Sequence, residues 1–532
     1  MGRRDALFLG VILAGSAAIG PSLAPPRSSP GDARPSARVD PGVRDAAARV
    51  DAALRDPSAP RVAGRAPDLA VIRRLSLAMA GTIPSLEEIR RIEAGPAEAR
   101  VERHLDALLG DRRSADYLAE RLARAFVGVE GGPFLVYRRR RFVAWLSDQL
   151  MANRPYDALV RDLISGLGLW TDHPATNFVT VAYDPIKEEP NAERLAARVA
   201  RAFLGARIDC AQCHDHPFQP WKQADFRGLA AYFGQARSGL TGIRDDPTLA
   251  FTVEDRRSGK LVAVEPRAPF LPGLDPKVGT RRERLARWVT DRGNPSFARS
   301  AANRAWALLF GRPLVEPVDD LLAAGTEVPE ALRLLADDFA ANGHDLRRLI
   351  RTIAATDAFR VDSATPDDRP ALQAPWSTFP LTRLRPEQVA GALQQAASTR
   401  TIDAQSHILV RLATYGGVND FVRRHGDPGE AEFDDEAAST IPQRLLMMNG
   451  DLVDKSIKAD LGNATARIAL LAPDDARAVE AAYLAILTRR PTPEEARHFE
   501  GRMAGTRGED RKARITDLAW TLLNATEFSW NH

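Results

Sequence analysis

The chain has 532 residues, of which 44% are hydrophobic and 27% are charged, a composition typical of a globular protein with several domains. Lysine and arginine number 73 against 70 aspartates and glutamates, so a formal net charge of +3 excludes the strongly basic balance of a nucleic-acid-binding protein. Only two cysteines occur, so stability has to come from a packed core and not from a disulfide framework.

The N-terminus has the features of an export signal. Arg3 and Arg4 form a short basic region, and an uncharged apolar run follows from residue 6 to about residue 19. We therefore expect a signal peptide over residues 1–24 and export to the periplasm or the cell surface. Small residues offer cleavage points after Ala18 and after Ala24. Because Pro25 directly follows the second point, an uncleaved membrane anchor stays open as the alternative. Membrane contact is expected through this segment only.

Apolar residues at helical spacing recur along most of the remaining chain, which predicts a mainly α protein. Residues 25–66 are expected to be a flexible linker in which a short helix could form. Two helical domains are expected to follow, the first over residues 67–240 and the second over residues 280–532. A Pro- and Gly-rich connector over residues 241–279 lies between them.

The connector carries the clearest β signal of the chain. Two short runs of β-prone residues, 251–253 and 261–264, flank a turn-forming segment over residues 256–260. We therefore expect one small β-hairpin inserted into an otherwise helical protein.

Capping boxes predict where three of the helices begin. In a capping box a Ser or Thr side chain accepts a hydrogen bond from the amide three residues later, and a Glu there returns one. The three pairs are Ser85 with Glu88, Thr280 with Glu283, and Thr492 with Glu495.

The candidate chemistry of the chain is concentrated in residues 210–218. This stretch contains both cysteines, Cys210 and Cys213, followed by His214 and His216. Two thiols three residues apart with an adjacent histidine form the C-x-x-C-H pattern of haem c attachment, in which the thiols form thioethers and the imidazole is the proximal iron ligand. Cys210, Cys213 and His214 are therefore the candidate haem-binding residues.

Other interpretations of the same residues stay open. Cys210, Cys213, His214 and His216 could together hold zinc or a non-haem iron ion, although two histidines at i, i+2 are cramped for one tetrahedral ion. The two thiols could also form a disulfide or a redox-active dithiol. Carboxylates that could complete a metal site belong to Asp209, Asp215, Asp319 and Asp320.

The surroundings of the motif bear on the haem interpretation. An amphipathic helix over residues 191–204 leads directly to the motif, and a second helix is expected over residues 221–233. No methionine follows the motif within the next hundred or so residues, so the sequence does not assign a sixth iron ligand. The aromatic residues that could form one wall of a haem slot are Phe203, Phe218, Trp221 and Phe226.

Together these motifs resemble the exported proteins of planctomycete type that join a cytochrome c-like domain to a C-terminal domain, both of unknown function. For the first domain the resemblance rests on Asn153-Arg154-Pro155-Tyr156-Asp157, Phe203-Leu204-Gly205, the run from Cys210 to Phe218, Trp221, Asp225-Phe226 and Tyr232-Phe233. For the second it rests on Leu285-Ala286-Arg287-Trp288, Asn294-Pro295, Asn303-Arg304-Ala305-Trp306, Phe310-Gly311, Val318-Asp319-Asp320 and the run from Arg489 to Glu495.

The resemblance covers about residues 67–532 and implies an exported cell-envelope protein that binds a c-type haem, with an electron-transfer or other redox role. The alternatives are a non-haem metal-binding protein or hydrolase that uses the Cys/His cluster, and a structural envelope protein with a C-x-x-C disulfide. No catalytic residue is assigned, and whether the protein is an enzyme is left open. A redox or envelope partner of unknown identity is expected, and no nucleic acid.

Overall fold

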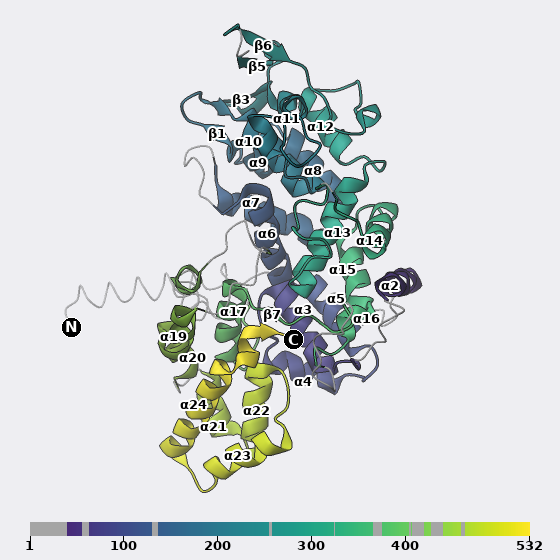
Figure 1. The fold of residues 1–532 in the computed structure, drawn as a ribbon. Helices are drawn as coiled ribbons and strands as arrows, with labels where there is room; N and C mark the ends of the chain where they lie inside the picture. Colours follow the sequence, from purple (N-terminus) through teal and green to yellow (C-terminus); the bar gives the residue numbers. More distant parts are fainter. Residues whose placement is uncertain are drawn as a thin grey trace, which may run out of the picture.

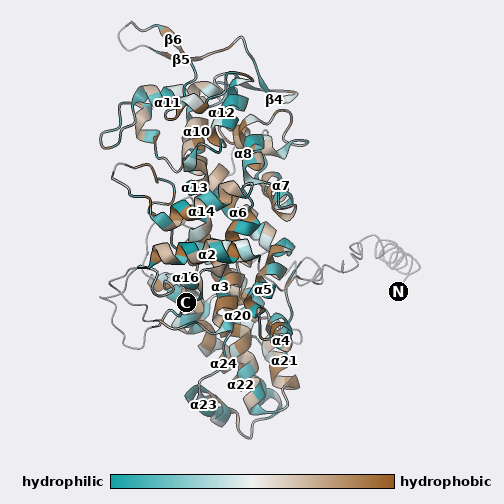
Figure 2. Ribbon diagram, turned by 90° about the vertical axis from the view of Figure 1, so that its right-hand side faces the viewer, coloured by the Kyte–Doolittle hydropathy of each residue, from teal (hydrophilic) through white to brown (hydrophobic). Residues whose placement is uncertain are grey.

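The computed structural model describes residues 40–55, 63–129, 137–254, 258–323, 325–364, 375–403, 406, 420–426, 433, 440–458 and 463–532 (Figure 1). The expected signal peptide over residues 1–24 lies outside the described residues, as does most of the expected linker. Within the described ranges, no helix combines the length and the apolar character needed to cross a membrane. The molecule is elongated, with the β5–β6 hairpin at one end and helix α23 at the other (Figures 1 and 2).

The protein is mainly α, as predicted. The first helices are α2 Pro41–Leu54, α3 Asp68–Ala80, α4 Leu86–Ala94, α5 Arg100–Leu109, α6 Arg112–Val127, α7 Arg139–Met151, α8 Tyr156–Ser165 and α9 Asn177–Thr180. Around the motif lie α10 Ala192–Val199, the π-helix η2 Ala200–Leu204, the 3-10 turn η3 Asp209–Gln212, α11 Gln223–Ala230 and η4 Ala231–Phe233. The later helices are α12 Arg281–Val289, α13 Pro295–Phe310, α14 Glu330–Ala341, α15 Leu346–Ala355, α16 Asp357–Arg360, α17 Pro386–Ala396, α19 Ile441–Asn449, α20 Asp451–Ile457, α21 Ala464–Leu471, α22 Asp475–Leu487, α23 Pro493–Met503 and α24 Gly508–Asn524.

The strands of the described residues form short antiparallel pairs. The predicted hairpin is present as β5 Phe251–Glu254 paired with β6 Leu261–Val264. Three further pairs were not predicted, because strands of two to four residues leave no readable alternation in the sequence. They are β1 Tyr183–Asp184 with β2 Glu189–Pro190, β3 Ala236–Gly239 with β4 Gly242–Asp245, and β7 Thr382–Arg383 with β8 Trp530–Asn531.

The three predicted capping boxes are confirmed. At the start of α4, the Ser85 hydroxyl accepts from the Glu88 amide at 3.0 Å, and the Ser85 amide donates to the Glu88 carboxylate at 2.8 Å. The same reciprocal pair opens α12 and α23. These helices therefore begin where local hydrogen-bonding chemistry places them.

The buried core has two parts that do not follow the expected domain boundary at residue 280. One cluster of buried apolar side chains extends from Val50 to Phe379, so α12 and α13 belong to the same core as the helices before the motif. The second cluster combines residues after Leu384 with α3 and α4 side chains such as Leu77 and Ile89. The domain limits therefore stay a prediction, whereas the core itself is continuous across residue 280.

Helix α13 is the centre of the first core. Nearly all of its side chains are buried, and it packs against α3, α14, α15 and η2. Its buried Asn303 accepts from the amides of Leu314 and Val315 at 2.9 and 3.1 Å and donates to the Val315 carbonyl at 2.8 Å. This side chain therefore fixes the turn that leaves α13 and leads to Asp319 and Asp320.

Candidate functional site

The segment that leads to the motif is a helix with an irregular last turn. The Asn191 side chain caps α10 by accepting from the Arg194 amide at 3.0 Å. The helix then continues as η2, a single π-helical stretch, which is an arrangement found frequently beside functional sites. Phe203 of η2 packs in the core against Phe126 and Phe178, with ring centroids 5.0 and 5.6 Å apart. The approach to the motif is therefore anchored in the protein interior.

Gly205 ends this helix and redirects the chain towards the cysteines. It has φ of 58°, in the left-handed region that favours glycine. Its carbonyl accepts from the amides of Leu321 and Leu322 at 2.7 and 3.2 Å. A Cβ at this position would stand 3.0 Å from the Leu321 side chain. In the Phe-Leu-Gly motif, Phe203 thus anchors the helix end in the core, and Gly205 forms a turn in which any larger residue would be strained.

Both thiols lie at the surface in the turn that follows. Cys210 is part of η3, Cys213 comes directly after it, and neither is in a disulfide. Both residues are exposed, as is His214, while His216 is partly buried. The motif therefore lies in a loop after the helix over residues 191–204, as the sequence predicted, and both cysteine residues are exposed.

The two histidines differ in which ring nitrogen is available. The Nδ1 atom of His214 lies 2.7 Å from the Asp215 carbonyl, which can only accept, so Nδ1 carries the proton and Nε2 keeps a free lone pair. In His216, Nδ1 accepts from the amides of Phe218 and Gln219 at 3.2 and 3.1 Å, so the ring proton is on Nε2. His214 is thus prepared to coordinate a metal through Nε2, whereas His216 is engaged in shaping the loop.

Residues from the second half of the chain hold both ends of the loop. The buried Asp320 carboxylate accepts from the Arg207 amide at 3.1 Å and from the Gln219 side chain at 3.0 Å. Gln219 in turn accepts from the Trp221 indole at 2.8 Å, and the Trp221 carbonyl accepts from the His216 amide at 2.8 Å. One carboxylate therefore ties the entry of the loop to its exit.

The other carboxylates near the motif are also engaged by neighbouring groups. Asp319 pairs with Arg207 at 2.6 Å, and Asp209 pairs with Arg201 at 2.7 Å. The Asp215 carboxylate accepts from the Gln223 amide at 2.8 Å. Within the described part of the chain, no three or more potential metal-ligating side chains come together as a metal site. The carboxylates thus act in this conformation as anchors of the loop.

The expected aromatic wall is only partly at the surface. Phe203 and Phe226 are buried in the core, and Trp221 is nearly so, with its ring 6.2 Å from that of Phe270. Phe218 is 85% exposed and is the one member of the four that projects to solvent beside the motif. The idea that all four rings line one slot is therefore wrong, because helix packing turns three of them inwards. Of the four rings, only Phe218 offers an exposed apolar surface in the motif loop.

Sequence reasoning missed the anchoring role of Asp320 and Gln219. Asp320 lies 113 positions from Arg207 in the chain, and neither residue has a local pattern that points to the other. The sequence signal for Asp320 was that Val318-Asp319-Asp320 is one of the motifs on which the resemblance of the second domain rests. Their proximity follows from the packing of α13 against η2.

Two protein-family models match the chain, in the order that the motifs predicted. Residues 49–238 match the model described as PSCyt2, a protein of unknown function (DUF1549). Residues 281–409 match the model described as PSD1, a protein of unknown function (DUF1553). No curated protein and no solved structure matches the chain. The anchoring of the motif loop by Asp320 thus joins the PSCyt2-like segment to the PSD1-like segment.

Proposed function

We propose that this protein is an exported cell-envelope protein that carries one covalently bound c-type haem and serves electron transfer or another redox reaction. The observation that carries the proposal is the state of the motif loop. Two accessible thiols that are not in a disulfide stand beside an imidazole whose Nδ1 donates to a carbonyl and whose Nε2 is free. That is the donor set that thioether attachment and proximal ligation require.

The residues present fit such a group. A bound haem would supply a one-electron iron centre at the surface of the protein. Cys210 and Cys213 would hold it, and His214 would supply the proximal nitrogen. The bond from His214 to the Asp215 carbonyl would keep the ring oriented and make Nε2 a stronger donor. Phe218 would offer an apolar contact at the edge of the group.

The test is production of the protein in a host with haem-attachment machinery, followed by intact mass and absorption spectroscopy after denaturation. The expected result is the mass increment of one haem and a Soret band that survive denaturation, since thioether bonds are covalent. Replacement of both cysteines, Cys210→Ser and Cys213→Ser, should abolish both signals. An unchanged mass without a Soret band in the unaltered protein would overturn the proposal.

A matched pair of histidine variants tests the assignment of the proximal ligand. His214→Gly should alter the ligand-field spectrum of the attached group, and added imidazole should restore it by occupying the vacated position. His216→Gly should change that spectrum less, and added imidazole should not reverse the change, because His216 holds the loop backbone through Nδ1 and supplies no ligand atom. Equal effects of the two substitutions would contradict the assignment to His214.

Export is tested separately from haem attachment. Fractionation of the producing cells should find the protein in the envelope or periplasm, and its mass should show removal of residues 1–24. Retention in the cytoplasm would contradict the expected export, which c-type haem attachment in bacteria requires.

A further inference from the structure

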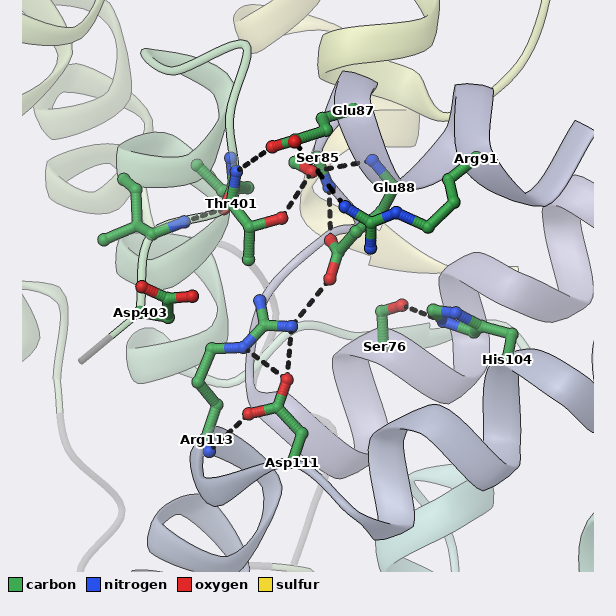
Figure 3. Close-up of polar contacts among 12 residues, drawn as sticks. Ser76, Ser85, Glu87, Glu88, Arg91, His104, Asp111, Arg113, Thr401 and Asp403 are labelled. Atoms are coloured by element: carbon green, nitrogen blue, oxygen red, sulfur yellow. Dashed lines mark hydrogen bonds and ion pairs between the residues drawn. The ribbon is translucent and has the colours of Figure 1, made fainter. Parts of the chain in front are cut away.

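A second candidate site lies far from the motif, between the N-terminal helices and the loop that follows α17. It is a water-accessible cavity of about 830 Å³. Residues of α4 and α5 line one side of it, and residues 398, 400–403 and 406 line part of the other; Figure 3 shows Glu88 and His104 on the first side and Thr401 and Asp403 on the second. The loop is held against α4 by the Ser85 and Thr401 hydroxyls, 2.9 Å apart, and by the Glu87 amide, which donates to the Thr399 carbonyl at 3.1 Å. The volume is within the range of small-ligand pockets.

One edge of the cavity is a rigid network of paired charges. The Arg113 guanidinium contacts the carboxylates of Glu88 and Asp111, each at 2.6 Å, as Figure 3 shows. The second Glu88 oxygen accepts from the Ser85 amide, so this buried carboxylate has partners on both oxygens. The Arg113 guanidinium holds the pKa of Glu88 below its usual value, against the opposing effect of burial. These groups satisfy one another and leave little charge for a ligand.

The remaining arginines of the cavity are not neutralised in this way. Arg100 and Arg103 donate to the backbone carbonyls of Glu93 and Pro96 rather than to carboxylates. Arg91 has only a 3.6 Å pair with Glu87 at the rim. Two more arginines line the cavity from other elements.

Those two are Arg400 and Arg467, which line the cavity from the loop after α17 and from α21. Among the residues that the structure describes, neither side chain forms an ion pair or a hydrogen bond. Among the described residues, the lining contains six arginines and four carboxylates, so the formal charge of this part of the lining is +2 with His104 neutral. Guanidinium groups that converge on one cavity without carboxylate partners suit oxyanions, which they bind through paired hydrogen bonds.

We propose that this cavity binds a small molecule that carries two or more oxyanion groups. A single oxyanion would use one or two of the guanidiniums. The arginines, however, line the cavity from several elements: Arg100 and Arg103 belong to α5, whereas Arg400 and Arg467 belong to the loop after α17 and to α21. A ligand with several anionic groups contacts both sides at once. This site is separate from the Cys/His loop and does not rest on the haem proposal.

The test is isothermal titration calorimetry of the purified protein with tripolyphosphate, with citrate and with orthophosphate. Tripolyphosphate or citrate should bind, and which of them binds distinguishes a phosphate-bearing ligand from a polycarboxylate. Orthophosphate should bind about tenfold or more weakly, because it cannot contact both sides. The double variant Arg400→Gln and Arg467→Gln should weaken polyanion binding by about tenfold or more, since two charge-assisted contacts are lost.

The matched control also removes two positive charges, but at positions outside the cavity. Arg423→Gln with Arg497→Gln changes two highly exposed arginines that do not line the cavity, and it should change affinity by less than about twofold. If the cavity double variant fails to fold, Arg91→Gln at the exposed rim replaces it in the same comparison. Absence of binding by both polyanions, or equal weakening by the cavity and control variants, would overturn the proposal.

Discussion

The motif loop and helix α3 place polar chemistry in opposite environments. Cys210 and Cys213 are exposed, whereas Arg73 and Arg74 of α3 are 1% and 0% exposed. The Arg74 guanidinium donates to the carbonyls of Phe359, Val361 and His532, each at 2.8 Å. Burial lowers the pKa of Arg74 to about 9, so its charge persists at neutral pH inside the protein.

The difference teaches which groups support the fold and which are available for chemistry. A buried charge is tolerated only when hydrogen bonds offset the loss of water, so the three carbonyls that accept from Arg74 make it part of the architecture. It joins α3 to residues near 360 and to the C-terminal His532, and Figure 1 shows the C-terminus beside α3. The motif loop instead leaves both cysteine residues exposed and is held by hydrogen bonds to Asp320 and Gln223. Substitutions in the two regions should therefore differ in kind.

The largest effect is expected from Arg74→Met. The change removes the donor to two buried carbonyls and one partly buried carbonyl, and it removes the guanidinium that lies 3.8 Å from the centre of the Phe379 ring. We expect a loss of about 3–5 kcal/mol in the free energy of unfolding, measured by urea titration. Arg90→Met, at an exposed position of α4, is the control and should cost less than about 0.5 kcal/mol. Equal losses would remove the contrast between buried and surface arginines.

The next prediction concerns the pH dependence of stability. It tests whether the buried His104 side chain, like Arg74, contributes to the free energy of unfolding. His104 is buried on α5, its Nε2 lies 2.8 Å from the Ser76 hydroxyl, and burial lowers its pKa to about 4. Because the folded pKa lies below the unfolded value of about 6.5, the unfolded chain binds more protons between these values. The contribution of His104 to the free energy of unfolding is complete above pH 6.5, and it should fall by about 2 kcal/mol as the pH drops to 4.5.

The measurement is urea unfolding at several pH values for the unaltered protein and for His104→Gln. The variant should show a shallower dependence on pH, because its side chain does not titrate. Some slope should remain, since burial also lowers the pKa of His425 to about 4. Parallel curves for the two proteins would show that His104 does not contribute to the pH dependence.

Gly205→Ala tests how firmly the start of the motif loop is tied to the core. The added methyl group meets the Leu321 side chain at 3.0 Å in a left-handed backbone conformation. We expect a loss of about 1–2 kcal/mol in the free energy of unfolding. Gly239→Ala is the control, because nothing lies within 4 Å of the added carbon there. A loss no larger than that of the control would show that the loop tolerates a different entry.

Asp320→Ala should have the smallest effect on global stability and the most local one. Loss of its carboxylate removes the acceptor of the Arg207 amide and of the Gln219 side chain. We expect a loss of about 1 kcal/mol in the free energy of unfolding. Hydrogen exchange at the Arg207 amide, measured by NMR or mass spectrometry, should become faster. Asp246→Ala, which removes the local bonds to Thr248 and a 3.8 Å ion pair with Arg244, should leave that amide unchanged. Unchanged exchange in the Asp320 variant would mean that other contacts hold the loop.

The sequence predicted those features whose causes are local. The capping boxes and the β5–β6 hairpin depend on residues within a few positions of each other, so short patterns predict them. The C-x-x-C-H spacing is local in the same sense, and it placed the candidate residues in one loop. The pairing of β7 with β8 could not be predicted in this way, because it joins residues far apart in the chain.

For the candidate site, the sequence by itself determined which atoms are available: two thiols, two imidazoles and the turn that presents them. Only the tertiary structure decided how they are presented. It brings Asp320 to both ends of the loop, buries Phe203 while exposing Phe218, and gives His214 and His216 opposite tautomers. It also gathers Arg400 and Arg467 with Arg100 and Arg103 around one cavity. Such arrangements depend on packing between distant segments, and no spacing along the chain records which helices come into contact.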